Sequence, residues 1–174
     1  MPTKSQLIAA PLLAFATVAA ATPAAATGEV IRIQRNPQAI ILEAARVNAG
    51  ADTIYVSGQL PSPLDPTMPM SAVTSIEQMG DTRQQTISTL AKIKDILETQ
   101  GFTMADVVKL TLMVAADPRT GAMDFAGANA GYREFFGTAE NPTTVARSTF
   151  QVAALVGPHY LIEIEAIAAR APTE

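Results

Sequence analysis

The chain has 174 residues, of which 48% are hydrophobic and 16% charged, and it carries a net charge of -4. This length suits one domain with a short appendage, and the apolar content is sufficient for a packed core. The acidic balance, without any run of like charges, disfavours a nucleic-acid partner. The absence of cysteine excludes disulfides and a thiolate nucleophile, and the single histidine disfavours a protein-held metal ion.

The first 26 residues have the pattern of a secretory signal peptide. Lys4 lies in a short polar start, an apolar run extends over residues 7–21, and three alanines at 24–26 precede Thr27. This apolar run is shorter than the roughly 20 residues that span a bilayer, which favours cleavage over a membrane anchor. We therefore predict removal of residues 1–26, leaving a periplasmic or secreted protein without membrane attachment and with a single domain over residues 27–174.

The first part of the remaining chain is predicted to form strands and a long loop. Residues 29–35 alternate apolar and polar side chains, as a half-buried strand does. Residues 42–47 and 53–57 are also typical of strands, and the Asn and Gly between them suit the turn of a β-hairpin that would join the two. Four prolines within residues 58–71 remove backbone donors and predict a surface loop.

Two helices and three further strands are predicted after this loop. Apolar residues recur at three- and four-residue steps over residues 81–100 and 124–136, and a glycine follows each helix. Period-two alternation predicts strands over residues 106–114, 144–152 and 160–168. The order of elements gives an α+β fold, with a mixed sheet that has two helices on one face. Because no third helix can cover the other, partly apolar face, we expect self-association to bury it.

Five segments resemble the RidA/YjgF family, the reactive intermediate deaminase A proteins, in their order and approximate spacing. They are residues 53–61 (TIYVSGQLP), 106–109 (DVVK), Asn129 with Tyr132 and 135–136 (FF), 146–148 (ARS) and 162–168 (IEIEAIA). The resemblance covers about residues 30–168. It implies a chorismate-mutase-like fold, assembled as a homotrimer whose sheets face inward and whose sites lie in clefts between subunits.

The resemblance also implies an activity, the hydrolysis of 2-imino acids and their enamine tautomers to 2-keto acids and ammonia, with no cofactor or metal. Arg147 matches the arginine that holds the substrate carboxylate, a task suited to the planar guanidinium fork. Glu163 matches the acidic residue beside the hydrolytic water, where it manages protons. Arg147 and Glu163 are thus the catalytic candidates, and Ser57, Gly58 and Asn129 are assigned to substrate binding.

Some residues depart from the family pattern and leave alternatives open. Deaminating members carry a tyrosine that closes the pocket, and Ile41 stands roughly at its place; Thr149 stands where a cysteine is frequent. Arg147 and Glu163 favour an imine-hydrolysing enzyme, whereas Ile41 favours a non-catalytic trimer of the same fold that binds small carboxylates. A third function, endoribonuclease, is a label of some family members that the acidic charge disfavours. Without the motifs, an ion-pair role would be favoured for Arg147, and residues 146–148 in register reverse that preference. A helix-surface role for Asn129 is as well supported as a role in the site.

Overall fold

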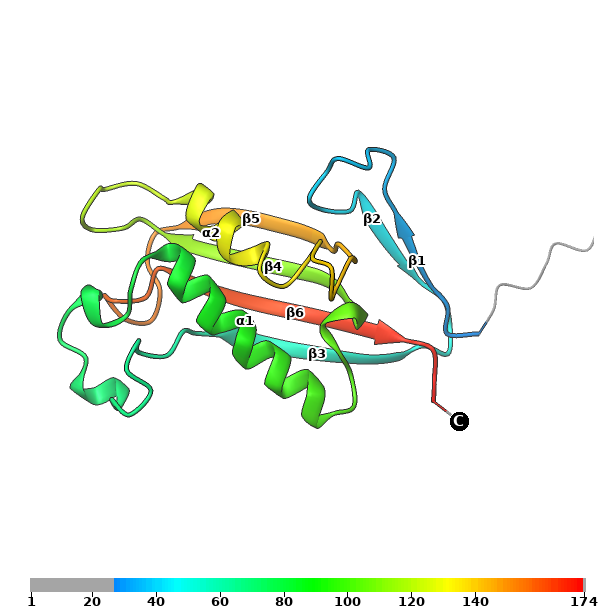
Figure 1. The fold of residues 1–174 in the computed structure, drawn as a ribbon, viewed down its shortest axis with the longest axis horizontal. Coiled ribbons are helices and arrows are strands. Elements are labelled where there is room, and N and C mark those ends of the chain that lie inside the picture. The colour runs from blue at the N-terminus through cyan, green and yellow to red at the C-terminus, as the bar shows by residue number, and fades with distance from the viewer. Residues whose placement is uncertain (1–26, 174) are drawn as a thin grey trace, which may run out of the picture.

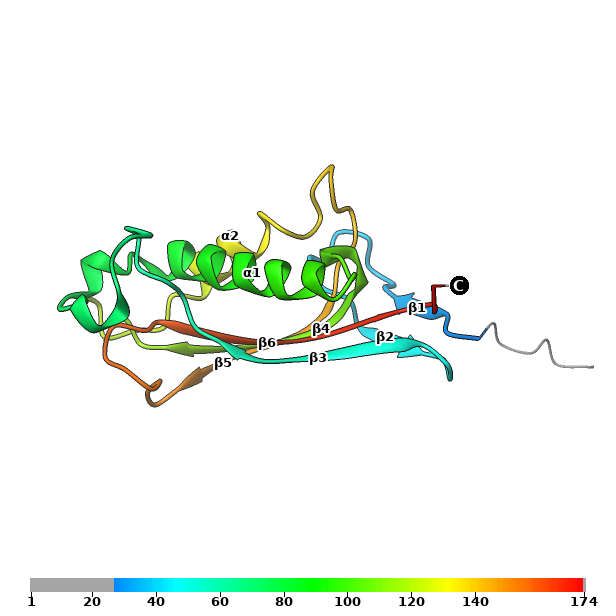
Figure 2. The same cartoon turned by 90° about the horizontal axis from the view of Figure 1, so that it is seen from below.

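The computed structural model describes residues 27–173 and contains a four-stranded sheet with two helices on one face (Figures 1 and 2). The strand order is β3-β6-β4-β5. β6 (Ile162–Arg170) pairs antiparallel with both β3 (Asp52–Gln59) and β4 (Val107–Ala115), whereas β5 (Ala146–Val152) pairs parallel with β4. The prediction of an α+β fold with a mixed sheet is confirmed.

The two helices lie side by side over the sheet. α1 (Thr82–Thr99) begins at Asp81, whose side chain accepts a hydrogen bond from the Gln84 amide while the Gln84 side chain accepts one from the Asp81 amide. This capping box explains why the helix starts there. α2 (Phe125–Tyr132) is shorter than predicted, because residues 133–136 form turns instead of a further helical turn.

Short 3₁₀ helices occupy the connections around α1. The long loop after β3 contains η1 (Met70–Ala72) and η2 (Ile76–Gln78), and η3 (Met104–Asp106) leads directly into β4. The predicted surface loop is present, but it starts after Gln59 because β3 continues through Gly58.

The core lies between the helices and the sheet. In β6 the apolar members of the alternation are buried against the helices, namely Ile162, Ile164, Ala166 and Ala168. Glu163, Glu165 and Ile167 take the opposite face, as the period-two pattern predicts. That opposite face has no helix over it within residues 27–173, and it exposes Tyr55 to 76% and Phe150 to 46%.

A separate hairpin of β1 (Val30–Ile33) and β2 (Ala44–Val47) lies beside the main sheet (Figure 1). The predicted hairpin between residues 42–47 and 53–57 is therefore wrong, since β2 pairs with β1 and β3 pairs with β6. The turn after β2 forms hydrogen bonds with the segment before β1 instead. The Asn48 amide donates to the Glu29 carbonyl, and the Gly28 amide donates to the Ala49 carbonyl.

Arg32 connects this hairpin to the main sheet. Its Nη1 donates to the carbonyls of Val107 and Thr144 at 2.9 and 3.0 Å, and its Nη2 donates to the Ala105 carbonyl at 2.6 Å. Burial of the guanidinium lowers the pKa of Arg32 from its ordinary value. One side chain therefore attaches the hairpin to the segments that lead into β4 and β5.

We predict that Arg32→Met destabilises the protein by about 2 to 4 kcal/mol, because it removes three charge-assisted hydrogen bonds and leaves carbonyl groups without donors. Arg46→Met is the matched control, since Arg46 is exposed on the neighbouring strand β2. Its effect should stay within about 0.5 kcal/mol. Urea unfolding of both variants at one protein concentration measures the difference, and equal midpoints would contradict the role of Arg32.

No helix within residues 27–173 is long and apolar enough to span a bilayer. The predicted signal peptide, residues 1–26, lies outside the described residues, so its cleavage and the boundary of the exported domain stay predictions.

Candidate active site

Arg147 lies on β5 and its guanidinium packs under α2. Its Nη2 donates to Oδ1 of Asn129 at 2.6 Å, and its Cζ lies 4.6 Å from the centroid of the Tyr132 ring. Tyr132 in turn stacks on Phe136, with ring centroids 4.8 Å apart. Burial lowers the pKa of Arg147, but a guanidinium remains protonated in proteins. The sequence-predicted residues Arg147 and Asn129 are thus in direct contact.

Two polar atoms of this region are buried and have no hydrogen-bond partner among residues 27–173. They are Nη1 of Arg147 and Oγ1 of Thr149. The two side chains stand two residues apart on β5, so they share one face of the strand. Buried donors without acceptors are costly, and a carboxylate is the kind of acceptor that a guanidinium N–H binds most strongly.

Thr149 was not among the sequence-predicted site residues. Its spacing from Arg147 on a predicted strand is the signal that could have identified it. We call Arg147, Asn129, Tyr132 and Thr149 the arginine group.

Glu163 on β6 lies against Gly58 on β3. A Cβ atom at Gly58 would overlap the Glu163 carboxylate, so the absence of a side chain at Gly58 is what allows the carboxylate to lie there. The pairing of β3 with β6 is irregular between Val56 and Gln59, which places Ser57 and Gly58 in the irregular stretch. We call Ser57, Gly58 and Glu163 the glutamate group.

The arginine group and the glutamate group lie on opposite faces of the sheet. Arg147 pairs with Leu110, which pairs with Ala166, and both partners are buried beneath the helices. Glu163 precedes Ala166 by three residues, so its side chain points to the uncovered face. One chain therefore brings Arg147 together with Asn129, and Glu163 with Gly58, but it does not bring the two groups to one point.

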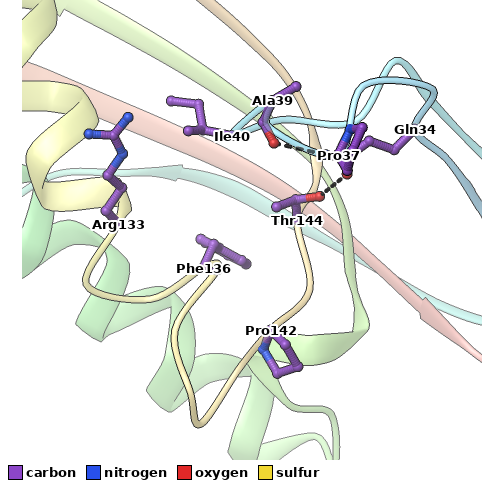
Figure 3. Close-up of a pocket in the computed structure, with 9 residues that line it drawn as sticks. Gln34, Pro37, Ala39, Ile40, Arg133, Phe136, Pro142 and Thr144 are labelled. Atoms are coloured by element: carbon purple, nitrogen blue, oxygen red, sulfur yellow. Dashed lines mark hydrogen bonds between the residues drawn. The ribbon is translucent and has the colours of Figure 1, made fainter.

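A cavity of about 560 Å³ lies next to the arginine group, between the segment after β1 and the segment after α2 (Figure 3). Its lining includes Gln34, Ile40, Arg133, Phe136 and Thr144. The Tyr132 hydroxyl donates to the Ile40 carbonyl at 3.0 Å, so Tyr132 bridges the cavity wall and Arg147.

Ile41, which stands near the family's pocket tyrosine, is directed elsewhere. It packs against the hydrophobic core and does not line this cavity, whereas its neighbours Ala39 and Ile40 do. Across residues 27–173 there is no group of three or more His, Asp or Glu side chains arranged to hold a metal ion.

The sequence matches a family model described as endoribonuclease L-PSP over residues 43–170. A 2-iminobutanoate/2-iminopropanoate deaminase of Salmonella typhimurium is 37% identical over 142 residues, covering 82% of this chain and 98% of that protein. A RutC family protein of Haemophilus influenzae is 34% identical over 146 residues, covering 82% of this chain and 97% of the relative.

Two solved structures share the fold. The Rid family protein YyfB of Yersinia pestis superposes with a TM-score of 0.60 at 27% identity, covering 80% of this chain and 97% of that one. TdcF of E. coli, solved with bound serine, gives a TM-score of 0.52 at 28% identity, covering 81% and 100%.

Gly58→Ala should displace the Glu163 carboxylate while leaving the fold intact. The added methyl meets the flexible end of a side chain that can rotate away, so we expect a stability loss below about 1 kcal/mol. Gly131→Ala is the contrasting variant, because its methyl would meet Cβ of Thr86 and the Arg83 carbonyl on α1. That overpacking should cost about 1 to 3 kcal/mol.

Thermal unfolding of both glycine variants and a crystal structure of Gly58→Ala provide the measurements. An unmoved Glu163 carboxylate in Gly58→Ala would show that the two residues are not in close contact.

Proposed function

Because this chain belongs to the RidA/YjgF family, we propose that it hydrolyses reactive 2-imino acids and their enamine tautomers to 2-keto acids and ammonia. The observation that carries the proposal is the partly buried guanidinium of Arg147, which Asn129 holds at 2.6 Å and which keeps a buried N–H without a partner among residues 27–173. Such a group is prepared to bind a carboxylate, the feature that every 2-imino acid has beside its C=N carbon.

In this reaction the substrate carboxylate lies on Arg147, with the Thr149 hydroxyl as a second donor. Asn129 fixes one edge of the guanidinium and the Tyr132 ring supports its face, so the donors are oriented before the substrate arrives. A water oxygen attacks the imine carbon and gives a carbinolamine, while the Glu163 carboxylate accepts the water proton and returns it to the nitrogen. The hydroxyl proton of the carbinolamine then passes to the amino nitrogen, the C=O bond of the 2-keto acid forms, and the C–N bond breaks as ammonia leaves.

The positions of the two groups imply that the site needs more than one copy of the chain. Arg147 and Glu163 point to opposite faces of their own sheet, so both act on one substrate only if they come from different subunits. The uncovered face, with Tyr55 and Phe150 exposed, offers an apolar surface for such an assembly. We propose a homotrimer whose sheets face inward, as the family resemblance implies.

A non-catalytic protein that binds small carboxylates is the second candidate. The observation that favours it is Ile41, which packs into the core and supplies no hydroxyl over the pocket. In that case Arg147 would bind a 2-keto acid and no turnover would follow. RNA cleavage, the activity in the family model's description, is disfavoured here because the net charge is -4 and the sequence has no basic run. We also propose that the protein acts outside the cytoplasm, on the pattern of residues 1–26.

The test of the function uses Arg147→Lys and Arg147→Ala. Lysine keeps the charge but loses the planar fork, and alanine leaves the substrate carboxylate without a partner. Hydrolysis of freshly generated 2-iminopropanoate should fall by roughly 30-fold or more in the Ala variant, with only partial recovery in the Lys variant. Calorimetry with pyruvate accompanies the assay. If the wild type does not hydrolyse the imine but binds pyruvate in a way that depends on Arg147, the carboxylate-binding protein is supported. If neither variant changes the rate or the binding, both candidate functions are refuted.

A complementation experiment tests the assembly of the site. Arg147→Ala and Glu163→Gln should each be inactive alone, yet their coexpressed mixture should regain activity if one site takes Arg147 and Glu163 from two subunits. Light scattering should report the mass of a trimer for the wild type and the mixture. Activity absent from a verified mixed trimer, or a folded monomer at micromolar concentration, would contradict this arrangement.

A further inference from the structure

Arg133 supplies a second guanidinium close to Arg147. It follows Asn129 by one helical turn, and its amide donates to the Asn129 carbonyl at 3.1 Å at the end of α2. Residues four apart project from the same side of a helix. The charge of Arg133 contributes to the lowered pKa of Arg147, after the larger effect of burial. The arginine group therefore has a second positive charge at its border.

Arg133 is also the charged residue of the neighbouring cavity. Figure 3 shows it together with Phe136 and Pro142 from the segment after α2, and with Ile40 from the segment after β1. The side chain of Arg133 is exposed and makes no hydrogen bond or ion pair with any residue of the described range 27–173. Its donors are thus available to a ligand.

The other polar side chains of the cavity already bind one another. The Thr144 hydroxyl donates to Oε1 of Gln34 at 2.8 Å, and Nε2 of Gln34 donates to the Ala39 carbonyl at 2.8 Å. The wall also includes the apolar residues Ile40, Phe136 and Pro142. The cavity therefore combines apolar wall residues with one free cation, which suits an aliphatic chain that ends in an acidic group.

We propose that this cavity binds the substrate side chain and that Arg133 pairs with an acidic group at its end, so that the preferred substrates are 2-imino dicarboxylic acids. This assignment rests on the proposed function, because it takes Arg147 as the anchor of the first carboxylate. The volume of about 560 Å³ exceeds what the methyl or ethyl side chain of 2-iminopropanoate or 2-iminobutanoate would fill. Two guanidinium groups flanking the substrate would also neutralise both of its charges.

The test compares the binding of 2-ketoglutarate and 2-ketobutyrate, products with and without the second carboxylate, by calorimetry at constant ionic strength. The wild type should bind 2-ketoglutarate more tightly. Arg133→Gln should weaken the binding of 2-ketoglutarate by about tenfold and leave the binding of 2-ketobutyrate unchanged within about twofold, because only 2-ketoglutarate has a second carboxylate to pair with Arg133. Arg46→Gln removes an exposed arginine that does not line the cavity, and it should alter neither ligand.

A second variant, Ile40→Phe, tests the cavity rather than the charge. The larger side chain narrows the cavity and should weaken the binding of 2-ketoglutarate more than that of 2-ketobutyrate. The proposal is overturned if the wild type does not bind 2-ketoglutarate more tightly than 2-ketobutyrate, or if Arg133→Gln keeps this preference. It is also overturned if Arg133→Gln weakens the binding of both ligands equally, as a general loss of positive charge would.

The failure of this proposal and that of the proposed function give different results. Arg133-dependent binding of 2-ketoglutarate without any imine turnover supports the cavity assignment and refutes hydrolysis. If hydrolysis of 2-iminobutanoate depends on Arg147, but the preference for 2-ketoglutarate over 2-ketobutyrate is the same in Arg133→Gln, hydrolysis is supported and the cavity assignment is refuted.

Discussion

The Tyr132 side chain is the contact on which the candidate site depends. Its ring supports the Arg147 guanidinium at 4.6 Å and stacks on Phe136, while its hydroxyl donates to the Ile40 carbonyl. The residue is only 1% exposed, so these contacts are made in a desolvated setting where polar interactions are strengthened. One aromatic side chain thereby fixes the helix α2, the strand that carries Arg147 and the wall of the cavity relative to one another.

The sheet imposes a second constraint, because its alternation assigns neighbouring residues to different surroundings. Arg147 belongs to the face beneath the helices, and Glu163 belongs to the face that lacks such a cover. In the proposed site, Arg147 would hold the substrate carboxylate inside one subunit while Glu163 would face a second subunit. A proposed intersubunit site is the simplest arrangement that uses both residues on one substrate.

Periodicity in the sequence predicted both helices and most strands, since apolar spacing reflects which side of each element is buried. The pairing of the strands was harder to predict. The turn after β2 has residues typical of a β2–β3 hairpin, but its backbone groups form hydrogen bonds with Gly28 and Glu29 instead. Arg147, Asn129, Gly58 and Glu163 were predicted from their motifs, whereas their distribution over two faces required the register of β4, β5 and β6. Thr149 and Arg133 were not assigned to the site, because the burial of the first and the cavity beside the second depend on tertiary contacts that no local pattern records.

The β1–β2 hairpin is separate from the main sheet, and this affects how the wall of the cavity can change. The hairpin forms its own two-stranded sheet and is tied to the main sheet through Arg32 and through the Leu42 amide, which donates to the Val145 carbonyl. The segment between its strands supplies Gln34, Ala39 and Ile40 to the cavity. Exchanges at Gln34 or Ala39 would reshape the cavity, whereas exchanges at Ile41 would also disturb the core that α1, α2 and the four-stranded sheet share. The outer part of the segment thus sets the shape of the cavity wall, while its inner part belongs to the core.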